Sequence, residues 1–169
     1  MLNMNSIINL IHSITASLLS YYYIQNPIIN IKRSLFFISN TYFLTDTYLI
    51  RNDHYLDISH HLLSILSLIS FYIGYYENIL IKLFYLAEMS NISIFGHYLV
   101  LKNIENENIV YISSVLEFCI YTYYRCFCMT QILIENHDLF LFTPLMPLLI
   151  IYYMSIDWSI TLFKNLYYH

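Results

Sequence analysis

Two adjacent histidines, His60 and His61, are the residues whose types and spacing point most directly to chemistry. Asp57 precedes them by three and four residues, which places its carboxylate on the same broad face of a helix. A neutral imidazole can act as a base or as an acyl acceptor, and a nearby carboxylate can fix its tautomer and stabilise the imidazolium. Because neighbouring residues differ by about 100° around a helix, one of the two can aim squarely at a pocket. We therefore predict that His60 or His61 carries any reaction, helped by Asp57 or Asp46.

A second set of ionisable residues lies inside stretches that are otherwise apolar. Each such group costs roughly 2.5–3.5 kcal/mol at the centre of a bilayer if it faces lipid. We therefore expect these side chains to point into a bundle interior, where they pair or hydrogen-bond. For each of them, a structural ion pair that holds two helices in register is the alternative to a functional role. The residues are Asp46, Glu88, Glu117, Arg125 and Asp157.

The composition indicates that the ionisable residues lie in an apolar environment. Hydrophobic residues make up 59% of the 169 residues and charged residues only 11%, whereas a soluble domain carries about 25% charged residues. A net charge of −4 and the lack of a basic run argue against a nucleic-acid footprint. The three cysteines lie in one apolar stretch, so we expect them to be packing residues and not a disulfide framework. The composition predicts an integral membrane protein with one domain.

Apolar stretches long enough to cross ~30 Å of hydrocarbon as a helix can be drawn six times. They cover residues 7–24, 34–50, 58–76, 79–101, 109–134 and 147–166. The polar segments between them are short, so sequential helices run antiparallel. We therefore predict an all-α membrane protein, a single bundle of about six transmembrane helices with both termini on the same side. Three Lys or Arg residues fall on each side, so the positive-inside rule gives no orientation.

The first apolar stretch is expected to remain in the mature protein, because it lacks a basic leading region and is too polar for a signal peptide. Small residues recur along one face of this stretch, a spacing that suits close packing against a neighbouring helix. These are Ser13, Ala16, Ser17 and Ser20.

Counting along antiparallel helices places most of the histidines and several acids at a similar depth. This grouping rests on distance from the nearest polar segment and predicts no individual contact. The group contains His12, Asp46, His60, His61, His97 and Glu117. Along the fifth apolar stretch, polar residues recur every four positions and share one face of a helix: Glu117, Tyr121 and Arg125. Contact with other helices is the simplest role for these side chains.

These motifs, in this order, resemble the TLC-domain family of multi-pass membrane proteins over most of the chain. That family includes the ceramide synthases, the translocating-chain-associated membrane proteins and several small lipid-homeostasis proteins. The likeness begins with a histidine in an early helix and an aromatic–Phe–x–x–Asp pattern, and it continues through the histidine pair to a Glu–x–Ser motif, a lone arginine and the ending MSIDWSITLFKNL. The residues are His12, Tyr42, Phe43, Asp46, His60, His61, Glu88, Ser90 and Arg125.

The chain departs from the ceramide synthases at one motif. Those enzymes carry a His–Asp–x–x–Asp motif after the histidine pair, and the corresponding positions here, counted without gaps, are Ala87, Glu88 and Asn91. One acid is kept as glutamate, while the histidine and the second aspartate are lost. The Glu–x–Ser form is more similar to the smaller TLC-domain proteins, which affect membrane lipid composition.

The resemblance implies one TLC-like transmembrane domain over residues 1–169, located in the endoplasmic reticulum. Its expected role in lipid metabolism is sphingolipid or phospholipid homeostasis by lipid binding, sensing or modification. Expected partners are membrane lipids, with homo- or hetero-oligomers formed through transmembrane helices, and no nucleic acid. The residues expected to contact the substrate are Glu88, Ser90, His97, Glu117, Arg125 and Asp157.

Two alternatives stay open at this point. The first is a ceramide-synthase-like acyltransferase that uses the His60–His61 pair and acyl-CoA as co-substrate; such an enzyme should need histidine at Ala87. The second is a small transporter or channel, which predicts helices broken by Gly or Pro near mid-membrane. No histidines are spaced as HxxxH, and a haem held by His60 or His61 with His97 is disfavoured, so we expect no metal and no cofactor.

Overall fold

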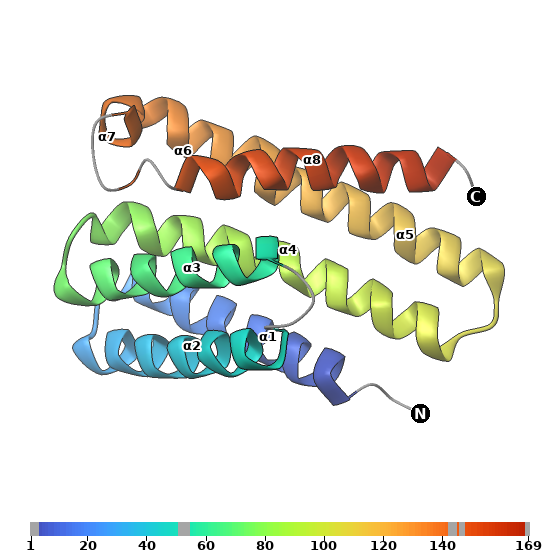
Figure 1. Ribbon diagram of the computed structural model, residues 1–169, viewed down its shortest axis with the longest axis horizontal. Coiled ribbons are helices and arrows are strands. Elements are labelled where there is room, and N and C mark those ends of the chain that lie inside the picture. Colours follow the sequence, from blue (N-terminus) through green and yellow to red (C-terminus); the bar gives the residue numbers. More distant parts are fainter. Residues whose placement is uncertain (1–3, 51–54, 142–144, 146–147, 168–169) are drawn as a thin grey trace. The chain divides into compact units, whose positions relative to one another are not determined.

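The computed structural model describes residues 4–50, 55–141, 145 and 148–167, and the regular secondary structure in them is entirely helical (Figure 1). Helices α5, η1 and α6 follow one another without a break, so the described chain forms seven separate helices. The elements are α1 (Met4–Gln25), α2 (Ile29–Ile50), α3 (Tyr55–Ile73), α4 (Glu77–Asn103), α5 (Glu107–Thr122), the π-helix η1 (Tyr123–Cys128), α6 (Met129–Glu135), α7 (His137–Leu141) and α8 (Leu148–Tyr167).

The all-α prediction is confirmed, and each of the six apolar stretches corresponds to a long helix. The short helix α7 was not expected, because its residues begin in a segment that the sequence assigns to a polar connection. Two helices, over Asn5–Gln25 and Glu77–Asn103, are long and apolar enough to cross a membrane, and the apolar part of α3 is shorter (Ile58–Ile73). Two such helices are weak support for membrane insertion, so six transmembrane crossings stay a prediction.

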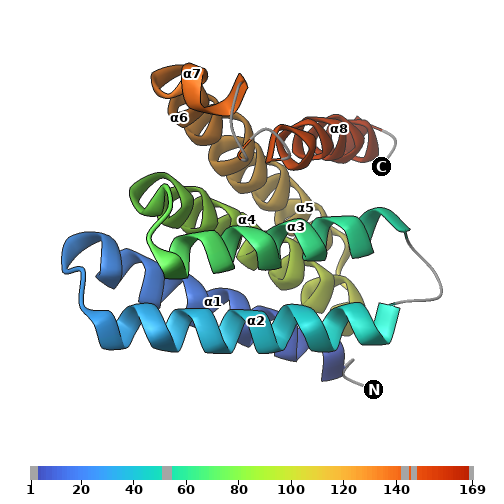
Figure 2. The ribbon, with the colours of Figure 1, turned by 60° about the vertical axis from the view of Figure 1, so that its left-hand side comes forward.

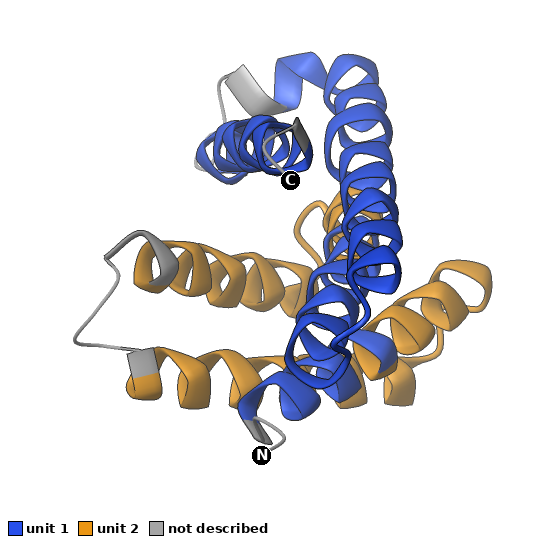
Figure 3. Ribbon diagram, turned by 90° about the vertical axis from the view of Figure 1, so that its right-hand side faces the viewer, with its two compact units in different colours: residues 1–14, 86–169 blue, residues 15–85 orange. Residues whose placement is uncertain are grey.

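The chain divides into two compact units, coloured separately in Figure 3. Unit 1 comprises residues 1–14 and 86–169, and unit 2 comprises residues 15–85. Helices α1 and α4 each contribute residues to both units.

Unit 2 is built around the antiparallel helices α2 and α3, which lie side by side in Figures 1 and 2. Aromatic rings fill the space between them: Phe36 stacks on Tyr72 with ring centroids 4.3 Å apart. Leu35, Leu68 and Phe71 are almost completely buried.

A polar cluster closes one end of unit 2. Lys32 Nζ donates to Glu77 Oε2 at 2.5 Å, and the Tyr23 hydroxyl donates to the other oxygen of the same carboxylate. Lys32 also lies over the ring of Phe71, 5.1 Å from its centroid. The chain reaches Glu77 through Gly74, whose φ of +92° is a conformation that favours glycine. This cluster joins the end of α1 and the beginning of α2 to the beginning of α4.

In unit 1, helix α8 packs against α5 and η1 (Figure 1). Asn106 caps α5, because its side-chain oxygen accepts hydrogen bonds from the backbone N–H groups of Asn108 and Ile109 at 3.0 and 3.3 Å. The π-helix η1 widens one stretch of this long helix around Arg125. Such insertions occur often at functional sites.

Polar residues are as common as hydrophobic residues among the buried side chains. Among the described residues, fourteen polar or charged side chains are buried, against thirteen hydrophobic ones. Large apolar side chains are exposed along α1, α2, α3, α5, η1 and α8; examples are Leu18, Tyr48, Leu66, Phe127 and Tyr153, each at least 59% exposed. The predicted small-residue face of α1 is confirmed as a buried face: Ser13, Ala16, Ser17 and Ser20 are all at most 3% exposed.

We predict that enlarging this buried face destabilises the protein. Ala16 is completely buried, so Ala16→Leu forces extra methylene groups into a filled space and should cost about 1–3 kcal/mol. Thr41→Leu, at an exposed position of α2, is the matched control and should change stability by less than about 0.5 kcal/mol. Thermal unfolding of the purified variants in detergent measures both values. Equal melting temperatures for the two variants would contradict close packing at Ala16.

Candidate functional site

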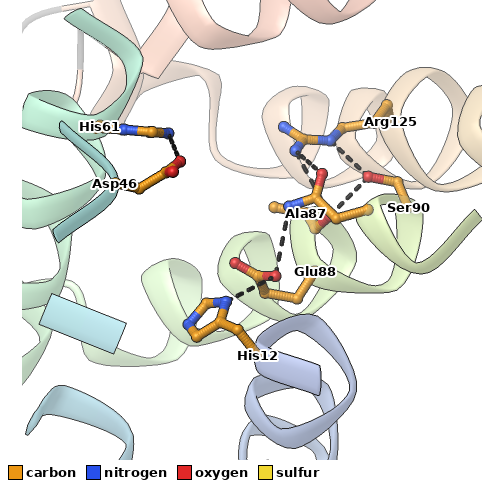
Figure 4. A network of polar contacts seen from close by, with 8 residues as sticks. His12, Asp46, His61, Ala87, Glu88, Ser90 and Arg125 are labelled. Atoms are coloured by element: carbon orange, nitrogen blue, oxygen red, sulfur yellow. Dashed lines mark hydrogen bonds and ion pairs between the residues drawn. The ribbon is translucent and has the colours of Figure 1, made fainter. Parts of the chain in front are cut away.

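Arg125 is the centre of a buried polar network in unit 1 (Figure 4). Its side chain extends from η1 and is 4% exposed. Its Nε donates to Ser90 Oγ at 2.8 Å, and one terminal nitrogen donates to Ser155 Oγ at 3.4 Å. The other terminal nitrogen donates to Asn91 Oδ1 at 3.3 Å and to the carbonyl oxygen of Ala87 at 3.5 Å. The guanidinium therefore joins η1 to both α4 and α8.

The same network continues to a buried carboxylate. Glu88 is 1% exposed, and one of its oxygens, Oε2, accepts a hydrogen bond from the Asn91 amide at 3.4 Å. The same oxygen lies 3.7 Å from His12 Nδ1 of α1 (Figure 4). Asn91 thus bridges Arg125 and Glu88. Because an isolated charge in an apolar interior is costly, this chain of contacts stabilises both ionisable groups.

The π-helix η1 determines the direction in which the Arg125 side chain extends. In a π-helix the hydrogen bonds span five residues instead of four, so side chains there are rotated relative to those of a regular α-helix. Arg125 is buried on this π-helix, and so is Met129 at the beginning of α6, while Phe127 is 70% exposed. The sequence carried no signal for this local winding, and the prediction of one regular helix over residues 109–134 missed it.

In unit 2, the structure brings Asp46 and His61 together. His61 Nε2 lies 3.5 Å from Asp46 Oδ2, and the other ring nitrogen lies 3.3 Å from the Thr47 hydroxyl. Thr47 donates its own proton to the carbonyl of Phe43 at 2.6 Å, so Nδ1 of His61 acts as the donor to Thr47. Nε2 of His61 therefore faces the Asp46 carboxylate. His61 is buried, and Phe43 packs against its ring at 5.4 Å.

A third pair, His97 and Glu117, connects α4 and α5 in unit 1. His97 Nε2 lies 3.7 Å from Glu117 Oε2, while Nδ1 lies 2.7 Å from the Ser113 hydroxyl. Both side chains line a cleft of about 710 Å³ in unit 1. The cleft therefore gives a ligand access to this histidine–carboxylate pair.

The group predicted from depth is thus divided into separate pairs. Asp46 and His61 meet in unit 2, and His97 and Glu117 meet in unit 1. His60 lies next to His61 with ring centroids 5.8 Å apart, and its side chain is half-buried. The side chain of Asp57, together with His54, lies outside what the structure describes.

One expectation about orientation is wrong. Asp157 was expected to point into the interior, yet it is exposed on α8. The buried face of this helix is formed by Ser155, Ser159 and Leu162. Asp157 is two residues from Ser155 and therefore lies on the opposite side of the helix. The inward orientation is confirmed for Glu88, Glu117 and Arg125, and Asp46 is half-buried.

Sequence reasoning missed several partners of the ionisable residues. Asn91 was noted as a lost aspartate, whereas the structure shows it as the bridge between Glu88 and Arg125. Ser155 and Ser113 carried no motif that singled them out. Thr47 directly follows Asp46, and a hydroxyl beside a candidate acid was the one available signal.

Compared with models of protein families, with curated proteins and with solved structures, the chain has no match in any of the three. Among the residues that the structure describes, no three His, Cys, Asp or Glu side chains are grouped so as to hold a metal ion.

We predict that Arg125 is required for stability. Arg125→Met removes the donors to Ser90, Ser155 and Asn91 and leaves Glu88 without its positive neighbour, so it should cost about 3–5 kcal/mol. Thermal unfolding in detergent should show a melting temperature lower by roughly 6–20 °C.

Lys164→Met is the matched control, since Lys164 is exposed on α8 and should contribute less than about 1 kcal/mol. Arg125→Lys keeps the charge and loses the planar fork, so its stability should lie between wild type and Arg125→Met. An Arg125→Met variant as stable as Lys164→Met would show that the network does not hold the helices together.

Proposed function

We propose that this chain is a TLC-type multi-pass membrane protein that handles membrane lipids by binding, sensing or modifying them. The observation that carries the proposal is the distribution of polarity: serine, histidine, glutamate and arginine side chains are buried, while large apolar side chains are exposed along α1, α2, α3, α5 and α8. In water such a surface would be a very large exposed apolar patch. In a bilayer the same surface is solvated by lipid chains, and the buried polar groups hold the helices together.

The lipid role is supported by the order of motifs that resembles the TLC-domain family and by the distribution of polar groups. The Arg125 guanidinium donates to oxygen atoms of the chain itself, which suits a structural role better than recognition of a head group. The His97–Glu117 pair lines a cleft of about 710 Å³, and the half-buried Asp46 lies 3.5 Å from His61. We therefore propose that these two pairs are the groups that contact polar parts of lipids. The endoplasmic reticulum is the location that the resemblance favours.

The lipid role is tested by mass spectrometry of lipids that copurify with the full chain in mild detergent. We expect one or a few lipid species enriched over the host membrane, and the enrichment should fall in Asp46→Asn and Glu117→Gln. Asp138→Asn, at an exposed carboxylate beside His137, is the control and should retain it. A copurified lipid profile identical to that of the host membrane, in the wild type and all variants, would contradict selective lipid handling.

Topology provides a separate prediction. With six crossings, both termini lie on the same side of the membrane, whereas an odd number of crossings places them on opposite sides. Glycosylation acceptor sites fused to each end, expressed with endoplasmic reticulum membranes, should be modified together or not at all. Modification of one terminus alone rules out six crossings.

The second candidate function is acyl-CoA-dependent acyl transfer, and the contact between Asp46 and His61 favours it. A histidine held by a carboxylate can take a proton from an attacking hydroxyl or amine as the acyl group leaves CoA. Ala87 supplies only its backbone carbonyl to Arg125, so the histidine of the ceramide-synthase motif has no side-chain counterpart at this position.

We predict that His61, which lies against Asp46 and Thr47, carries any reaction, and that His60 does not. His61→Ala should lower the effect of the protein on cellular lipid composition by roughly 10²–10⁴-fold in rate if the histidine is a general base. His60→Ala, which changes the adjacent residue, should keep most of it. Lipidomics of cells that express equal amounts of each folded variant measures this. If both variants fold and keep the full effect, the enzymatic role is excluded.

A further inference from the structure

The lining of one cleft includes the histidine–carboxylate pair His97 and Glu117. It lies in unit 1, where the segment between α4 and α5 approaches the C-terminal part of α8, and its volume is about 710 Å³. Apolar side chains, among them Leu101 and Leu162, form part of its wall. Its ionisable and amide residues are His97, Glu105, Glu107, Asn108, Glu117 and Asn165.

The hydrogen bonds around His97 determine which of its two ring nitrogens carries the proton when the ring is neutral. Ser113 donates its hydroxyl proton to the carbonyl of Val110 at 2.7 Å, so its oxygen can only accept from His97 Nδ1, also at 2.7 Å. A neutral His97 is therefore protonated at Nδ1 and carries a lone pair at Nε2. Ser114 lies 3.5 Å from Nε2, but its hydroxyl also donates to Val110, at 3.1 Å.

Glu117 faces this lone pair without a donor between them. Its Oε2 is 3.7 Å from His97 Nε2, too far for a hydrogen bond. Glu117 is 6% exposed, and no described residue donates a hydrogen bond to its carboxylate. A buried carboxylate without a donor is costly. When Glu117 is ionised, its carboxylate and Nε2 of His97 are both acceptors, and a hydrogen-bond donor bound in the cleft would satisfy them.

The charge of the cleft narrows the class of donor. Glu105, Glu107 and Glu117 line it, and no Lys or Arg is among its described lining residues. Glu105 and Glu107 are exposed at the edge of the cleft. Tyr111 presents an aromatic ring, which also attracts cations. A donor that is also a cation satisfies the acceptors and the negative charge together.

We infer that this cleft binds an organic ammonium ion whose N–H groups lie between Glu117 and His97. The ammonium can belong to the head group of an amine-bearing lipid or to a free amine, and the apolar wall accepts the attached carbon chain in either case. This inference rests on the proposed function, and it adds the class of ligand that the His97–Glu117 pair binds. Its failure would leave the topology and the Asp46–His61 pair unaffected.

The test is calorimetric titration of the full chain, purified in a neutral maltoside detergent, with butylammonium and with dodecylammonium. We expect saturable binding of the ammonium compounds and no binding of butanol or butyrate, which match butylammonium in length. Affinity that rises with chain length identifies a lipid as the source of the ammonium, and equal affinities identify a free amine.

Glu117→Gln should weaken ammonium binding by roughly 10-fold or more, because a charge-assisted hydrogen bond is lost. Glu135→Gln, at an exposed acid outside the cleft, is the matched control and should bind as the wild type does. If Glu117→Gln does not fold, the exposed pair Glu105→Gln/Glu107→Gln replaces it and should weaken binding by roughly 3-fold or more.

Three results would overturn the inference. The first is that no ammonium compound binds, which would leave only water as the donor. The second is that butanol binds as tightly as butylammonium, which would show that charge plays no part. The third is that the cleft variants bind as tightly as Glu135→Gln, which would place the ammonium elsewhere on the protein.

Discussion

An ionisable or hydrogen-bonding side chain inside an apolar layer of helices must find its partner within the protein, and the arrangement of this chain depends on that constraint. Leaving a buried charge without a partner costs several kcal/mol, whereas one buried apolar side chain contributes about 1.5–3 kcal/mol. Glu88, with 1% of its surface exposed, meets this requirement through Asn91 and His12. The same requirement brings Arg125 into contact with α4 and α8.

The π-helix is best understood as a consequence of this constraint. A regular α-helix over Glu107–Glu135 would direct its side chains at fixed intervals of about 100°. The additional winding at Tyr123–Cys128 rotates Arg125 relative to the preceding turns, and the guanidinium then reaches Ser90 and Ser155 together. The three histidine–carboxylate pairs that connect different helices are smaller instances of the same principle. Where a pair is not fully satisfied by the chain, as at Glu117, a ligand can supply what is missing.

Much of the fold follows from the sequence, because the length of an apolar run determines a helix with little dependence on context. The partners of the ionisable groups could be predicted only in part. Depth along a helix placed Asp46 near His61 and His97 near Glu117, but it carries no information about rotation or about which helices adjoin. Rotation could have been read at Asp157, because Ser155, Ser159 and Leu162 already mark a face at helical spacing that excludes it. No local signal announces a π-helix, and Asn91 becomes a bridge only through residues far away in the sequence.

Contact between lipid and the outer apolar faces of these helices is the central proposal for this protein. The chain contains a single tryptophan, Trp158, which is 47% exposed near the middle of α8, so its fluorescence reports on this surface without any substitution. The decisive measurement is quenching of that fluorescence in bilayers by lipids brominated at mid-chain, compared with quenching by iodide in the surrounding water. If α8 faces lipid, we expect strong quenching by the brominated lipids, weak quenching by iodide and a blue-shifted emission. Strong iodide quenching with no effect of the brominated lipids would contradict the proposal, because α8 would then face water.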